Sequence, residues 1–289
     1  MKLVTYLHNG HEQLALLVGD VLYDTDALHP ELPSSMNMFL NYWEDCYPLA
    51  LNCERAIQDG RISTARGIDQ EGADWLAPVP LPVSVRLANA PGEGLPAQLP
   101  QLRHTDHQAV KGPGEISAMS DQLSHLESGC SAAIVVCRAG RNILATEADA
   151  FIGGIMLLNA FRSPRFQNDE TALALGPWLV TLDELEAMEI SPKAGHAGKS
   201  WHLELSATIN GSPAGSGNIS DMDWTFAELI ERASYGRDLF PGEIIGTRIF
   251  TNGAPLKAGD SVELNAEALG SLKNNVVVDE SDFSLLTRE

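Results

Sequence analysis

The first seventy residues place apolar and polar positions in an order that predicts a small α+β unit. Apolar runs at residues 2–7 and 14–25 suit strands, and the polar residues at 8–11 suit the turn of a hairpin. Between residues 36 and 61 apolar residues recur at helical spacing, and Ser34 and Ser35 offer an N-cap. We therefore expect a small N-terminal α+β domain over residues 1–74.

Prolines then interrupt the pattern and separate this unit from a β-rich remainder. Repeated prolines in residues 75–83 suppress helix and favour extended backbone, which predicts a hinge. Within 84–289, one helix is expected over 221–236, capped by Asp221 or Ser220. Strands are expected at 131–138, 176–185, 201–211, 243–250 and 260–270. The fold class is thus β-rich α+β, and no glycine-rich nucleotide fingerprint follows a strand.

Charge and cysteine content narrow the range of partners. The 289 residues carry 39 acidic and 19 basic side chains, a formal charge of −20 that opposes binding to nucleic acid or anionic membrane surfaces. No apolar run is long enough for a membrane span. The four cysteines show no C-x-x-C pair, so free thiols and a cytoplasmic location are expected.

Residues 126–143, LESGCSAAIVVCRAGRNI, resemble the strand D-Y-E-x-E-L-A-V-V-I-G-x-x-G-R-N-I of the fumarylacetoacetate hydrolase family. Further similar stretches follow in the same order, at 112–113, 176–181, 220–222, 240–247, 256–263 and 269–274. The resemblance implies a mixed β-roll or sandwich, a homodimer, and chemistry on 2-oxo or 1,3-dioxo acids. It covers most of the chain.

The acidic residues of that family motif are replaced in this chain. Family members hold Mg²⁺, Mn²⁺ or Ca²⁺ with three carboxylates, and the matching positions here are Gly129, Ser131 and Ala160, the last in an expected turn at 159–160. The histidine of the family lid is also missing from residues 85–94. These replacements predict that the ancestral metal site is lost and that no cofactor is bound.

Positive and polar side chains near these positions predict binding of a small anionic substrate, in particular a carboxylate. Arginine binds carboxylates bidentately, and hydroxyl and amide groups complete such sites. The candidate substrate-binding arginines are Arg162, Arg165 and Arg248. The family resemblance adds Thr171 and Thr247, which match positions where a hydroxyl meets the substrate, and Gln167, which matches either a substrate-binding glutamine or a lysine of the family. The alternative is that each arginine faces solvent or pairs with an acidic neighbour.

Candidate acid–base residues lie in a histidine cluster and at the start of the motif strand. His104 or His107, oriented by Asp106, could exchange protons near neutral pH, and Glu127 shares the strand parity of Gly129 and Ser131. The alternatives are a solvated loop or a new metal site built from the same three residues. Cys130 should point away from the pocket because it alternates with Gly129 and Ser131.

Three functions fit these patterns. The first is a metal-independent enzyme with lyase, tautomerase, dehydratase or cyclase chemistry on a small oxo acid or polyketide-like substrate. The second is a non-catalytic ligand-binding or scaffold protein. The third is a conventional metal-dependent hydrolase of a carbon–carbon bond. Fold alone does not choose among them.

Overall fold

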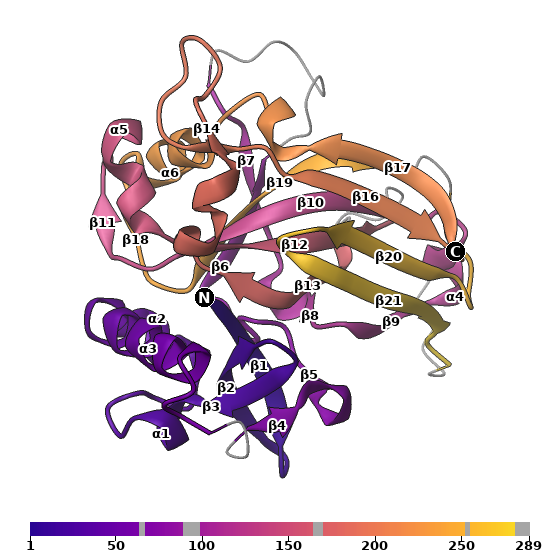
Figure 1. Cartoon of the computed structure of the whole chain (residues 1–289). Coiled ribbons are helices and arrows are strands. Elements are labelled where there is room, and N and C mark those ends of the chain that lie inside the picture. Colours follow the sequence, from indigo (N-terminus) through magenta and orange to yellow (C-terminus); the bar gives the residue numbers. More distant parts are fainter. Residues whose placement is uncertain (64–66, 89–98, 164–169, 252–254, 281–289) are drawn as a thin grey trace.

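A mixed sheet of twelve strands, counted over the described residues, joins the start of the chain to its middle and end (Figure 1). The computed structural model describes residues 1–63, 67–88, 99–163, 170–251 and 255–280. The order is β4-β3-β2-β1-β13-β12-β10-β19-β6-β7, with β5 on β1 and β8 on β13. The strands are β1 (Lys2–His8), β2 (His11–Val18), β3 (Val21–Asp24), β4 (Ile68–Asp69), β5 (Asp74–Trp75), β6 (Ser84–Ala88), β7 (Leu102–Thr105), β8 (Val110–Lys111), β10 (Glu127–Val136), β12 (Ile152–Arg162), β13 (Glu170–Val180) and β19 (Glu243–Thr251).

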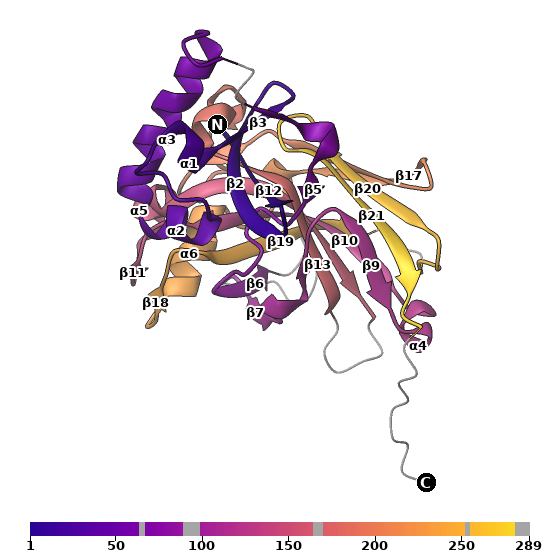
Figure 2. The same ribbon diagram turned by 90° about the horizontal axis from the view of Figure 1, so that it is seen from below.

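A second sheet packs across one face of the large sheet (Figure 2). In order it contains β17 (Ser212–Asn218), β16 (Glu204–Ile209), β20 (Ser261–Ala266), β21 (Gly270–Val278) and β9 (Gly114–Ala118). Two short ribbons are β11 (Gly140–Arg141) with β18 (Asp238–Leu239), and β14 (Glu189–Ile190) with β15 (Ser200–Trp201). We call the apolar layer between the two large sheets the roll core; it includes Cys130, Ile134, Leu264 and Leu272. The predicted β-rich α+β class is confirmed.

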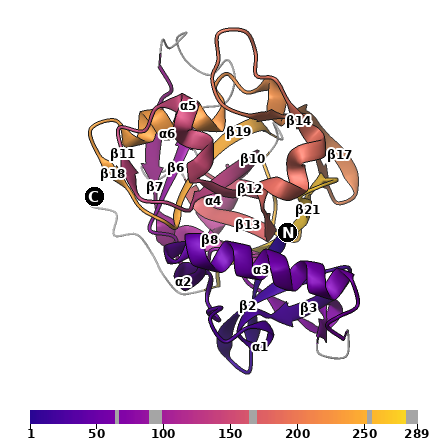
Figure 3. The ribbon, with the colours of Figure 1, turned by 60° about the vertical axis from the view of Figure 1, so that its left-hand side comes forward.

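Helices cover the opposite face and one end of the large sheet (Figure 3). They are α1 (Thr25–Leu28), α2 (Met36–Asn41), α3 (Trp43–Gln58), α4 (Ser120–Leu123), α5 (Ala145–Ala148) and α6 (Phe226–Ser234), with 3₁₀ turns η2 (Gln70–Gly72), η3 (His107–Ala109), η4 (Asp149–Phe151), η5 (Leu182–Met188) and η6 (Ile219–Asp221). We call the layer under α2 and α3 the junction core; it includes Phe39, Leu40, Val79, Val135 and Leu158. No helix within the described residues is long and apolar enough to cross a membrane.

Two predicted helix starts had different outcomes. The Ser35 hydroxyl accepts a hydrogen bond from the Met38 amide, which confirms the predicted cap of the first long helical stretch, although Tyr42 divides that stretch into α2 and α3. The predicted cap of α6 is wrong. Thr225 caps this helix, and Glu228 completes a capping box with it.

The predicted turn at residues 159–160 is also wrong. Asn159 and Ala160 lie within the eleven residues of β12, which pairs with β10 on one side and β13 on the other. All but the last residue of β12 are buried, because both faces of this strand pack against apolar layers. Such a strand shows no alternation of apolar and polar residues, which is why its pattern does not stand out.

The N-terminal unit shares its sheet with the main domain. β1 pairs with β13, with Lys2 opposite Val180. The segment predicted as a hinge also contributes to the junction core, since Ala77 and Val79 are buried there. One continuous sheet contains strands from both sides of residues 74 and 83, so its pairing does not mark a domain border at either residue. The predicted boundaries therefore stay predictions.

Candidate functional site

The two faces of β10 have different surroundings. Cys130 and Ile134 point into the roll core, while Ala133 and Val135 point into the junction core. Because strand side chains alternate, Gly129 and Ser131 share the second face. Gly129 lies opposite Ala160 on β12, so the three positions that resemble family ligands adjoin one another. Cys130 points away from them, as predicted.

Arg248 fills the space beside Gly129. It lies opposite Ser131 on β19 and is 6 % exposed. A methyl group built on Gly129 would lie 2.9 Å from the Arg248 Nε, 3.3 Å from its Cδ and 3.6 Å from the Ala160 carbonyl oxygen. The arginine side chain therefore lies over the glycine, and a larger residue at position 129 would have to displace it.

A second arginine and a carboxylate extend this surface toward the strand ends. Arg162 lies opposite Glu127, and its Nη2 is 3.4 Å from the Glu127 Oε2. Both side chains are part-exposed and lie on the same face as Gly129 and Ala160. Thr171 lies beside this surface: Leu173, two residues further along β13, is opposite Ala160, and Thr171 itself is at a register shift between β12 and β13.

We call this surface the Gly129 face and define it by seven residues: Glu127, Gly129, Ser131, Ala160, Arg162, Thr171 and Arg248. Gly129, Ser131, Ala160 and Thr171 match family positions, and Glu127, Arg162 and Arg248 were predicted to lie near them. Arg165 and Gln167 were predicted to belong here, but they lie outside the described residues.

Thr247 and the histidine cluster lie elsewhere. Thr247 is opposite Ala132, so it shares the face of β19 that points toward the roll core. His104 is opposite Arg86 on β6, and Arg86 is opposite Ile245, which also lies on the roll-core face. The structure therefore does not bring His104 or Thr247 to the Gly129 face, and their predicted roles stay untested.

The remaining members of the histidine cluster do not form a dyad. Asp106 caps η3 by accepting a hydrogen bond from the Gln108 amide at 2.9 Å. His107 is exposed and begins η3, and in the described residues no hydrogen bond joins Asp106 to His104 or His107. The predicted orientation of a histidine by Asp106 is thus not seen.

Cysteine chemistry is unfavourable at this site. All four cysteines are free, as predicted. Burial raises the pKa of the Cys130 thiol to about 12, and it has the same effect on the Cys137 thiol. Because the thiolate is the nucleophile, these protonated thiols are unreactive near neutral pH.

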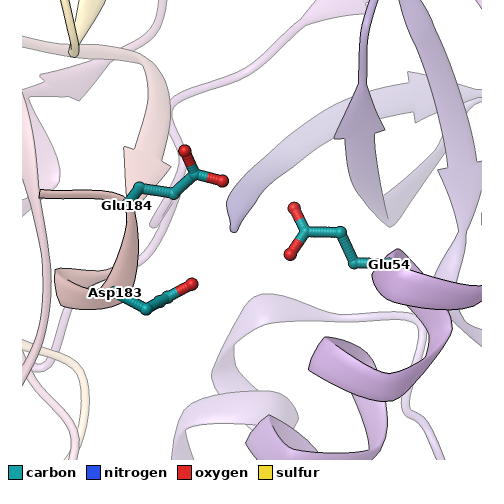
Figure 4. A group of neighbouring side chains, drawn as sticks. All are labelled: Glu54, Asp183 and Glu184. Atoms are coloured by element: carbon teal, nitrogen blue, oxygen red, sulfur yellow. The ribbon is translucent and has the colours of Figure 1, made fainter. Parts of the chain in front are cut away.

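Sequence reasoning missed an acidic group between the N-terminal unit and the main domain. The carboxylates of Glu54, Asp183 and Glu184 point toward one another from α3 and η5, with ligand atoms within 4.8 Å (Figure 4). The Met1 ammonium lies among them, 3.0 Å from Asp183, 2.9 Å from Glu184 and 3.8 Å from Glu54. Positions 54 and 183 are too far apart in sequence for any spacing rule to connect them.

The fold and the site together define a class of protein: a β-roll whose central strands present a small polar face beside a helical N-terminal unit. The family model for the fumarylacetoacetate hydrolase C-terminal domain matches residues 84–277. The chain belongs to this family.

Relatives of known activity act on small oxo acids or their isomers. The chain is 27 % identical over 172 residues to a maleylpyruvate hydrolase of Aquipseudomonas alcaligenes, a match that covers 57 % of this chain but only 56 % of that enzyme. It is 25 % identical to a mitochondrial oxaloacetate tautomerase of Rattus norvegicus, with 96 % of this chain and 92 % of the relative covered.

A solved structure with the same fold is the maleylpyruvate hydrolase of Sphingobium sp. SYK-6 in complex with manganese(II) and pyruvate. It superimposes with a TM-score of 0.76 at 18 % identity, covering 97 % of this chain and all of that one. The prediction that no cofactor is bound is therefore wrong as it stands. A protein of this fold holds a metal ion, and Glu54, Asp183 and Glu184 form a group that could ligate one here.

The two locations differ in how well their residues suit a divalent cation. Hard cations need several oxygen ligands, some of them charged. Gly129, Ser131 and Ala160 provide no carboxylate, and the Arg248 side chain lies beside them, so the Gly129 face does not fit such an ion. Glu54, Asp183 and Glu184 have the right donor type, although the Met1 ammonium lies between them.

Proposed function

We propose that the Gly129 face binds the carboxylate of a small oxo acid and that the chain is an enzyme that moves a proton on it, as a tautomerase or isomerase does. The observation that carries this proposal is the position of Arg248. Its side chain is almost fully buried over Gly129, in a protein whose formal charge is −20. A buried guanidinium beside small residues is suited to a planar anion.

The chemistry follows from what the face contains. Removal of a proton from the carbon next to a carbonyl sends the electron pair to the carbonyl oxygen, and a guanidinium stabilises the resulting enolate oxygen. Return of the proton to oxygen, or to another carbon, completes the isomerisation. Glu127 is the carboxylate of the Gly129 face and supplies the base, while Arg162 at 3.4 Å holds it in place.

The relatives support this class of substrate. Oxaloacetate tautomerases from rat and Bacillus subtilis are both 25 % identical to the chain, and the structure with the same fold contains pyruvate. We extend the proposal to a cytoplasmic homodimer, in line with the free thiols and the family resemblance. Sedimentation velocity on the purified chain measures its oligomeric state and so tests the homodimer.

The test compares Arg248→Gln with Arg248→Lys in an oxaloacetate keto–enol assay followed by ultraviolet absorbance, with and without added Mn²⁺. We expect at least a tenfold loss of turnover in Arg248→Gln, because one charged hydrogen bond to substrate contributes about 1.5–3 kcal/mol. Arg248→Lys should retain more activity than Arg248→Gln. Arg61→Gln is the matched control, because Arg61 is exposed and pairs only with Asp59 among the described residues.

Calorimetry with oxalate separates this proposal from a second one. A non-catalytic ligand-binding protein is favoured by one observation, namely that His104 does not reach the Gly129 face. If oxalate binds to the wild type and not to Arg248→Gln, while no oxo acid is turned over, the binding function holds and the catalytic one fails. Equal oxalate binding by the wild type and by Arg248→Gln would contradict both the catalytic and the ligand-binding proposal.

A further inference from the structure

A second group of cationic side chains lies on the other face of the large sheet, where β6 and β7 meet the end of α6. We call it the Arg86 cluster and define it as Arg86, His104, Arg237 and Glu243. Arg86 and His104 face each other across the β6–β7 ladder. The Arg237 Nη1 donates to the His104 Nε2 at 3.3 Å.

The Arg86 cluster is separate from the Gly129 face. Arg86 is level with Ile245 on β19, whereas Arg248, the nearest member of the Gly129 face on that strand, lies three residues further along. Three strand residues span roughly 10 Å. The two groups also lie on opposite faces of the sheet, so they are separate sites.

The floor of the cluster is a buried ion pair. Arg86 is 7 % exposed and its Nη2 lies 2.9 Å from the Glu243 Oε2. Glu243 also accepts hydrogen bonds from the Ser84 hydroxyl at 2.7 Å and the Phe240 amide at 2.9 Å. The charge of this carboxylate is therefore already balanced by Arg86 and its lone pairs are engaged.

Two arginines of the cluster have donor groups that no carboxylate of the described residues engages. The buried Arg86 Nε has no hydrogen-bond partner among the described residues. Arg237 is exposed, and no carboxylate of the described residues forms an ion pair with it, since its neighbour Asp238 pairs with Arg141. Arg237 donates instead to an imidazole, which can accept this bond only while it is neutral.

We propose that Arg237, His104 and Arg86 form an anion site that binds a small oxyanion, either a phosphate group or a carboxylate. The anion accepts hydrogen bonds from the Arg237 guanidinium and from a protonated His104, and the buried ion pair of Arg86 and Glu243 forms the floor of the site. Arginine and protonated histidine are the usual partners of such groups in proteins. Nothing in the proposed oxo-acid chemistry uses these residues.

Proton uptake should accompany binding. Burial and the charges of Arg86 and Arg237 lower the pKa of His104, whereas Glu243 raises it. Arg232 on the adjacent α6 adds a further positive group; its Nε donates to the Pro100 carbonyl. An anion between His104 and Arg237 would offset the repulsion, so the pKa of His104 should rise when it binds.

The test follows the imidazole signals of the eight histidines of the full chain by NMR as a function of pH. The His104 signal is identified by its loss in His104→Gln. We expect the pKa of His104 to lie below 6.5 in chloride at matched ionic strength and to rise when phosphate or acetate is added. A response to phosphate alone assigns a phosphate group, and a response to acetate alone assigns a carboxylate.

Two arginine variants test whether the response to the anion arises at this site. In Arg237→Gln, the pKa of His104 should rise in chloride and should no longer respond to either anion. Arg141→Gln is the matched control, because Arg141 is an exposed arginine on the ribbon strand beside Arg237 and should leave the response intact. The proposal is overturned if neither anion shifts the wild-type signal, or if Arg141→Gln removes the shift as completely as Arg237→Gln does.

Discussion

Different neighbours limit the room for a side chain at Gly129 and at Gly154, although both residues lie in central strands of the large sheet. A methyl group on Gly129 would meet the Nε of Arg248 at 2.9 Å, near the end of a flexible side chain. A methyl group on Gly154 would meet the Val180 carbonyl oxygen at 2.5 Å, and Leu179 at 2.9 Å. The backbone of a paired strand cannot move aside as a guanidinium can.

We expect Gly154→Ala to lower the free energy of unfolding by about 2 kcal/mol or more, in the range of overpacked cores. Gly129→Ala should cost less than about 1 kcal/mol, because Arg248 can adopt another rotamer. The same change should weaken oxalate binding, since it displaces Arg248, the side chain proposed to bind the carboxylate. Urea denaturation measures the first quantity and calorimetry the second. Equal stability of the two variants would contradict the difference in their surroundings.

At the level of elements, the start of α6 shows how a local sequence pattern can offer several caps. Ser220, Asp221 and Thr225 are all N-cap residue types within six positions. The structure uses Thr225, whose side chain accepts a hydrogen bond from the Glu228 amide while the Glu228 carboxylate accepts one from the Thr225 amide. Glu228 also contacts the His196 ring at 2.9 Å, which anchors the preceding loop.

Thr225→Ala should therefore destabilise the protein by about 1 kcal/mol, the usual cost of losing a cap. Asp221→Ala should change the free energy of unfolding by less than about 0.5 kcal/mol, because Asp221 is exposed and lies outside the helix. Thermal unfolding of both variants checks this. A larger effect of Asp221→Ala would support the cap predicted from sequence over the one in the structure.

Local signals predicted the elements that depend on them, and non-local pairing decided the others. The β1–β2 hairpin and the Ser35 cap follow from neighbouring residues and are confirmed. β12 escaped prediction because burial on both faces removes the alternation that marks a strand. The same limit applies to the site. Arg248 lies over Gly129 because of strand register, which no spacing along the chain reveals.

At the level of the whole molecule, strand pairing and the carboxylates of η5 tie the N-terminal unit to the main domain, and Asp183 makes several of these contacts. Asp183 on η5 accepts hydrogen bonds from the Tyr47 hydroxyl of α3 at 2.9 Å and from the Thr181 hydroxyl, and it contacts the Met1 ammonium at 3.0 Å. Burial alone would raise the pKa of Asp183, but these partners outweigh it and hold the pKa below its usual 3.8. Burial raises the pKa of nearby Glu54.

These opposite shifts give opposite contributions to stability. The Asp183 interactions stabilise the folded protein above the pKa of the unfolded chain, near 3.8, and this stabilisation is lost as the pH falls toward the lower folded pKa. Ionised Glu54 carries a desolvation cost, which is relieved as the pH falls through its raised pKa. A single stability curve mixes both effects, and only a comparison of variants separates them.

We expect Asp183→Asn to lower the free energy of unfolding by about 1–2 kcal/mol at neutral pH, the range of hydrogen bonds to a charged group. The difference from wild type should shrink below pH 3.8, where the unfolded carboxyl is already protonated. Asp238→Asn is the control, because its exposed pair with Arg141 should contribute less than about 0.5 kcal/mol. Urea denaturation across this pH range measures both. A pH-independent loss in Asp183→Asn would show that its role is steric packing rather than charge.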